Sequence, residues 1–112
     1  MAHRDFIKEN GFQAAALNCI YKVQDDFKTN ICAVIGKLND DGIPVACEGD
    51  LMGAISMLLL KFLTQGDATL TDFPQFDEAD ESVLMWHCGS TAKYFAEDNC
   101  YTLDTSYSGG LS

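Results

Sequence analysis

The segment that most constrains the fold is residues 51–63, an apolar stretch with the spacing of a helix. Its apolar side chains cover one face and much of the rest: Leu51, Met52, Ile55, Met57, Leu58, Leu59, Leu60 and Phe62. A helix that is apolar nearly all round is normally buried in something larger. We therefore expect other layers to cover this helix, and we expect the chain by itself to form a homo-oligomer through whatever apolar surface remains.

The same segment does not predict a membrane span. Gly53 and Ser56 interrupt it and Lys61 follows, so it falls well short of the roughly 20 apolar residues that a span needs. The N-terminus carries Arg4 and Asp5 where a signal peptide would be apolar. With 17 acidic against 7 basic residues, the net charge of −10 also disfavours nucleic acid and anionic membranes as partners. These features predict a cytoplasmic protein that binds neither.

Helix and strand patterns alternate along the chain. A polar run at 77–81 connects the last two strands as a hairpin, and residues 24–28 are expected to be a loop or short turn. The expected helices are 3–10, 30–38, 51–63 and a short one at 92–97, and the expected strands are 12–20, 43–47, 68–73 and 82–87. This order predicts an α/β fold, with helices layered on a largely parallel sheet that has a mixed edge.

The length of 112 residues suits one domain or less. We assign residues 1–104 to a single α/β unit. Residues 105–112 are rich in Ser and Gly and are expected to form a flexible tail.

Five cysteines form no CxxC pair, which disfavours a zinc knuckle or a thioredoxin-type motif. Most lie in apolar runs, so we expect buried, reduced thiols of a cytoplasmic protein. A thiol-based redox role is a third, weaker hypothesis. The cysteines are Cys19, Cys32, Cys47, Cys88 and Cys100.

Three polar residues follow predicted strands: Glu48, Asp72 and His87. In open α/β sheets, ligands bind beyond the carboxyl ends of the strands, and adjacent parallel strands would bring Glu48 close to Asp72. Two carboxylates and an imidazole suit a divalent cation such as Mn²⁺. Each residue also has an ordinary interpretation, as a solvated loop carboxylate, a turn residue and a core histidine. The pattern leaves a metal or acid–base site as a hypothesis.

Two neighbours of these residues have structural interpretations. Asp50 precedes the apolar helix and is expected to be its N-cap. Trp86 is expected to be a core aromatic, with stacking on a sugar as the alternative.

Longer motifs around these residues carry a family resemblance. Pro44-Val-Ala-Cys-Glu48-Gly-Asp50 and the Leu-Met-Gly-Ala helix after it, then Thr71-Asp72-Phe73, then Trp86-His87-Cys88-Gly89 resemble the L-fucose isomerase-like proteins. That group is related to the L-fucose and L-arabinose isomerases. The resemblance covers roughly residues 13–95.

The resemblance implies a metal-dependent aldose–ketose isomerase that acts on a small sugar through an ene-diol, with Mn²⁺ as the typical metal. Glu48 and Asp72 match the family's metal-binding and catalytic carboxylates, and His87 resembles a further metal ligand or substrate contact. Family members are much longer, so residues 1–104 are expected to be a partial catalytic domain within a fragment. The alternative is a non-catalytic sugar-binding or assembly module.

Overall fold

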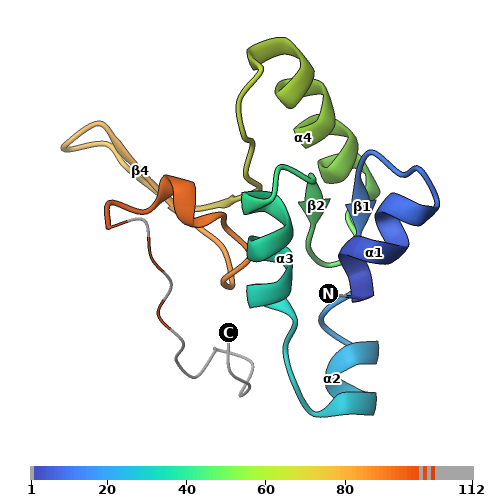
Figure 1. The fold of residues 1–112 in the computed structure, drawn as a ribbon. Helices are drawn as coiled ribbons and strands as arrows, with labels where there is room; N and C mark the ends of the chain where they lie inside the picture. The colour runs from blue at the N-terminus through green and yellow to red at the C-terminus, as the bar shows by residue number, and fades with distance from the viewer. Residues whose placement is uncertain (1, 99, 101, 103–112) are drawn as a thin grey trace.

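A computed structural model describes residues 2–98, 100 and 102 (Figure 1). The expected tail, 105–112, lies outside these residues. The predicted α/β class is confirmed. The elements are α1 (Ala2–Glu9), β1 (Ala15–Ala16), α2 (Lys22–Phe27), α3 (Cys32–Asp40), β2 (Val45–Ala46), α4 (Leu51–Thr64), β3 (Asp72–Asp77), β4 (Ser82–Trp86) and the 3₁₀ helix η1 (Lys93–Phe95).

The central layer is the parallel pair β1 and β2, with Ala15 opposite Val45 and Ala16 opposite Ala46. Backbone bonds extend the ladder on both sides: the Ala15 N–H donates to the Pro44 carbonyl and the Leu17 N–H to the Ala46 carbonyl, each at 3.0 Å. Both strands are shorter than expected. They nevertheless lie between helices on their two faces (Figure 1).

The two faces of this pair carry different side chains, because successive residues of a strand point to opposite sides. Val45 faces α1 and α3 and packs with Ile7, Ile35 and Leu38. Ala46 faces α4 and packs with Ala54 and Met57. The small side chains on the second face let α4 approach the strands closely.

Helix α4 begins at an N-cap, as predicted. The Gly53 N–H donates to Asp50 Oδ1 at 2.8 Å. Only Gly53, Ala54 and Met57 of this helix are buried, whereas Met52, Phe62 and Leu63 are more than 60% exposed. The core therefore covers one face of α4 and leaves most of its apolar surface open. No helix among the described residues has the length and apolar character to cross a membrane.

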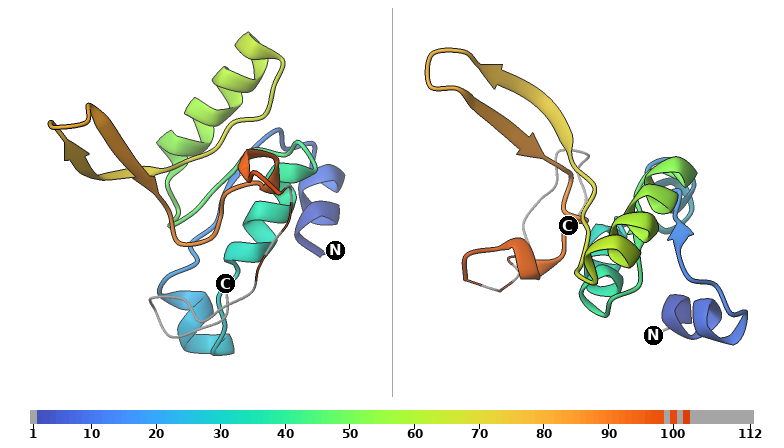
Figure 2. Two further views of the ribbon diagram at one scale, coloured as in Figure 1. Left: turned by 90° about the vertical axis from the view of Figure 1, so that its left-hand side faces the viewer. Right: turned by 90° about the horizontal axis from the view of Figure 1, so that it is seen from above.

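Strands β3 and β4 pair antiparallel and form a second sheet of their own. Residues 68–71 lie between α4 and β3 as an extended connection without a ladder, with Ala68 and Leu70 packed beside the α4 core. The register between Asp72 and Gln75 is irregular, which fits Pro74 because proline has no N–H to donate. Every residue of both strands is exposed, and the hairpin projects away from the helices (Figure 2). The antiparallel strands expected at the edge of the main sheet thus form a separate hairpin.

Smaller differences concern the connections. Residues 24–28 belong mostly to helix α2, which ends at Lys28 in a left-handed conformation, and the helix expected at 92–97 is the shorter η1. The helices predicted at 3–10, 30–38 and 51–63 are confirmed within two residues at each end.

Candidate functional site

Glu48 occupies a tight turn at the carboxyl end of β2. The Asp50 N–H donates to the Cys47 carbonyl at 3.0 Å, and the two residues between them have positive φ, 60° at Glu48 and 73° at Gly49. Such a φ costs a non-glycine residue on the order of 1–2 kcal/mol. The fold therefore holds the exposed Glu48 side chain in a strained turn, which is a common property of functional positions.

His87 follows β4, and its half-buried ring is anchored at one nitrogen. The Cys88 backbone N–H donates to Nδ1 at 2.9 Å, and Ser90 Oγ lies 3.0 Å from the same atom. A nitrogen that accepts an N–H carries a lone pair, so the proton of the neutral ring lies on Nε2. Nε2 is then a hydrogen-bond donor.

Charges around the ring act in the other direction. The Cys88 thiol beside Nδ1 raises the pKa of His87, burial opposes this rise, and the carboxylates of Asp72 and Glu48 add to it. Protonation of Nδ1 would break the backbone hydrogen bond from Cys88. We assign the neutral form, because the 2.9 Å bond from the Cys88 N–H is shorter than the 3.4 Å contact of the Cys88 thiol with the same nitrogen.

Glu48 and His87 come together in the folded chain. A Glu48 carboxylate oxygen, a His87 ring nitrogen and Cys88 Sγ all lie within 4.8 Å of one another. Within the described part of the chain, Asp72 does not join this group. Asp72 is the register partner of Trp86, and its charge reaches His87. The expected route to proximity, through adjacent parallel strands, is wrong because β2 and β3 belong to two separate sheets.

Trp86 is 48% exposed, so the prediction of a core aromatic is wrong. Among the described residues no layer covers either face of the hairpin, and its aromatic side chains consequently meet solvent. The indole stands next to His87 and opposite Asp72.

Sequence reasoning missed a cluster of thiols beneath this site. Cys19 Sγ lies 2.7 Å from Cys47 Sγ, and Cys88 Sγ lies 3.9 Å from both Cys32 Sγ and Cys47 Sγ. All five cysteines are free, and the predicted burial is confirmed for Cys19, Cys32 and Cys47. Hydrogen bonds from Cys32 and Cys47, together with His87, lower the pKa of Cys88. No local spacing signals this cluster, because the three sulfur pairs named above are 28, 56 and 41 residues apart in the sequence.

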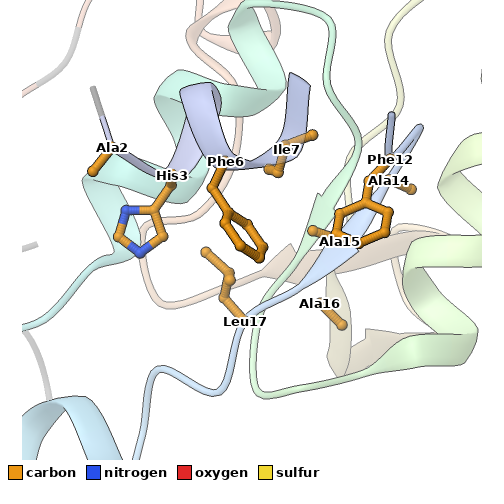
Figure 3. A pocket seen from close by; sticks show the side chains of 9 residues that line it. All are labelled: Ala2, His3, Phe6, Ile7, Phe12, Ala14, Ala15, Ala16 and Leu17. Carbon is orange, nitrogen blue, oxygen red and sulfur yellow. The ribbon is translucent and has the colours of Figure 1, made fainter. Parts of the chain in front are cut away.

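A separate pocket of about 540 Å³ lies between α1 and β1 (Figure 3). Its walls are apolar, with Phe6, Phe12 and Leu17 prominent and His3 as the one titratable lining residue. Sugar sites need several hydrogen-bonding groups, which these walls do not offer. Glu48, Asp72 and His87 do not line it.

A comparison of the amino-acid sequence with known proteins finds several similar sugar isomerases. The chain is 36% identical over 91 residues to the sulfoquinovose isomerase of Clostridium sp. (strain MSTE9), 34% over 87 residues to that of Priestia megaterium, and 31% over 98 residues to that of Alkalicoccus urumqiensis. The chain is related to sugar isomerases. These matches take in 81%, 77% and 87% of the chain.

The chain spans about a fifth of the length of these sugar isomerases, between 20% and 22%. No family model matches it. No solved structure matches it either. Relationship to sugar isomerases agrees with the general expectation from the sequence motifs.

Proposed function

We propose that this chain is part of a metal-dependent aldose–ketose isomerase of the L-fucose isomerase-like type. The observation that carries the proposal is the meeting of Glu48 and His87 in a relative of sugar isomerases. The relatives are named for sulfoquinovose, so that sugar is the first substrate to test.

The donor set fits a hard to borderline divalent cation such as Mn²⁺. Glu48 and Asp72 offer exposed carboxylates near His87, and oxygen ligands suit this ion. When bound, the ion would polarise the sugar carbonyl and stabilise the negative charge that develops on its oxygen. Glu48 and Asp72 are the residues that would hold it.

The residues of the chain supply the proton chemistry. Isomerisation moves a proton between C1 and C2 of the sugar through an ene-diol. A carboxylate, Glu48 or Asp72, accepts the carbon-bound proton and returns it to the neighbouring carbon. The Nε2–H of His87 donates to a sugar oxygen, which makes substrate contact the better of its two predicted roles. Trp86 offers an apolar face for the sugar ring.

Metal titration tests the proposal directly. Calorimetry with Mn²⁺ should show binding to the chain and at least a tenfold weaker binding to the Glu48→Gln/Asp72→Asn variant. The double variant Glu78→Gln/Glu97→Gln removes the same charge from two other exposed sites and should bind like the parent. Equal heats from all three proteins would remove the metal site.

A second experiment addresses the isomerase chemistry. In D₂O with Mn²⁺, an active site should exchange the C2 proton of sulfoquinovose for deuterium, which NMR detects. Sugar binding without exchange would support the second candidate function, a non-catalytic sugar-binding or assembly module.

The open face of α4 favours an assembly role in either case. Leu51, Met52, Leu59, Phe62 and Leu63 are each more than half exposed on this one helix. We infer that a second copy of the chain covers this face, because a twofold axis would bring the same apolar patch of both copies together and bury it.

A further inference from the structure

Three cysteines from distant parts of the chain meet beside the core, and a fourth, Cys19, lies next to one of them. Cys19 follows β1, Cys32 begins α3, Cys47 follows β2 and Cys88 follows β4. The three sulfurs of Cys32, Cys47 and Cys88 all lie within 4.8 Å of one another. We propose that these three thiols form a binding site for a thiophilic divalent cation, with Zn²⁺ as its natural type.

The sulfur spacing supports this site. Zinc–thiolate bonds of about 2.3 Å in a tetrahedron place neighbouring sulfurs about 3.8 Å apart. Cys88 Sγ lies 3.9 Å from Cys32 Sγ and 3.9 Å from Cys47 Sγ. Cys19 Sγ lies 2.7 Å from Cys47 Sγ and is the nearest further thiol to the site.

The surroundings favour a metal over a purely packed cluster. The parallel strands have two residues each, so few ladder hydrogen bonds join these segments and a metal cross-link would add to them. A metal here would join the segments after β1, β2 and β4 to the first turn of α3. Each thiol that binds releases its proton to solvent.

Ligand chemistry separates this site from the one proposed for Mn²⁺. Thiolates select zinc-like ions, whereas carboxylates select manganese-like ones. Cys47 precedes Glu48 and Cys88 follows His87, so consecutive residues serve the two sites. The thiol site does not depend on the proposed isomerase function.

Cobalt titration under reducing, oxygen-free conditions tests the proposal. Co²⁺ should bind one per chain and produce sulfur-to-cobalt charge-transfer absorption, which one equivalent of Zn²⁺ should abolish. Cys32→Ser and Cys47→Ser should lose most of this absorption, whereas Cys100→Ser, at an exposed cysteine, should keep it. Absence of the band from the parent chain, or its survival at full strength in both core variants, would overturn the site.

A second measurement uses the parent chain alone, so it does not depend on whether the serine variants fold. Zn²⁺ should slow the alkylation of Cys32, Cys47 and Cys88 at least tenfold relative to the metal-free chain, as mass spectrometry can show, and leave Cys100 unchanged. Equal rates with and without Zn²⁺ would contradict the proposal. The Glu48→Gln/Asp72→Asn variant should retain the cobalt band, so that failure of the Mn²⁺ site and failure of the thiol site are distinguishable.

Discussion

Asn39 and Val45 are joined by a reciprocal pair of hydrogen bonds. The Val45 N–H donates to Asn39 Oδ1 at 2.7 Å, and Asn39 Nδ2 donates to the Val45 carbonyl at 3.1 Å. The same Nδ2 lies 3.2 Å from the Ser90 carbonyl and donates to it. The buried amide thus bonds to β2 as a neighbouring strand would, and it ties β2 to the segment that follows His87.

Asn39→Ala should be among the most destabilising substitutions in the chain. It leaves the buried N–H and carbonyl of Val45 without their partner, at a cost of about 2–4 kcal/mol in the free energy of unfolding. Urea denaturation followed by circular dichroism measures it. Asn10→Ala, which removes an exposed amide bonded to the Phe6 carbonyl, serves as the control and should cost below about 1 kcal/mol.

Two substitutions of Asp50 should distinguish its hydrogen bond to the α4 N-terminus from the effect of its negative charge. Asp50→Ala removes the acceptor for the Gly53 N–H and should lower the free energy of unfolding by about 1 kcal/mol. Asp50→Asn keeps an acceptor and should retain most of that stability. Equal losses in both variants, measured in the same denaturation series, would mean that charge and not capping matters.

Gly42 and Gly11 together test the cost of positive φ. Both glycines have φ near 70°. A Cβ added at Gly11 would meet open space, whereas a Cβ added at Gly42 would lie 2.9 Å from Lys61 Nζ. That Nζ donates a hydrogen bond to the Gly42 carbonyl. Gly11→Ala should cost about 1 kcal/mol from φ alone, and Gly42→Ala more. Gly66→Ala, where φ is ordinary, should stay within about 0.5 kcal/mol of the parent.

Asp41 should titrate below the ordinary range of an aspartate. The hydrogen bond from Lys37 lowers the pKa of Asp41, and the charges of Lys37 and Arg4 add to this effect. Because the folded-state pKa is depressed, the pair stabilises the fold above the unfolded-state pKa, and this stability is lost as pH falls through the folded-state pKa. Carboxyl NMR should show Lys37→Met raising the pKa of Asp41, with Lys22→Met leaving it unchanged.

Association through α4 should depend on its open face. Leu59→Glu/Phe62→Glu places charges at two exposed positions and should shift the chain to monomer in light scattering across a concentration series. Phe27→Glu, at an even more exposed aromatic on α2, should leave the association unchanged. A parent chain that is monomeric at every concentration would contradict a self-interface.

The sequence predicts elements better than it predicts their contacts. Periodicity locates α4 and its cap at Asp50, because both depend on neighbouring residues. The β3–β4 hairpin was predicted from the polar turn at 77–81 and is confirmed. That β3 does not pair with β2 depends on how residues 68–71 run, which no local pattern specifies. Glu48 and His87 were predictable as strand-end residues. The thiol cluster is visible only in the folded chain, since the two sulfurs closest in space, those of Cys19 and Cys47, are 28 residues apart in the sequence.

The residues of the β3–β4 hairpin differ in their distance from the core. Asp72, Trp86 and the adjoining His87 lie at its base, whereas the turn at 78–81 lies at its far end and buries nothing. Insertions or deletions at that end would leave both the core and the base in place. The hairpin can therefore change in length and surface chemistry from one relative to another, and the proposed reaction centre stays where it is.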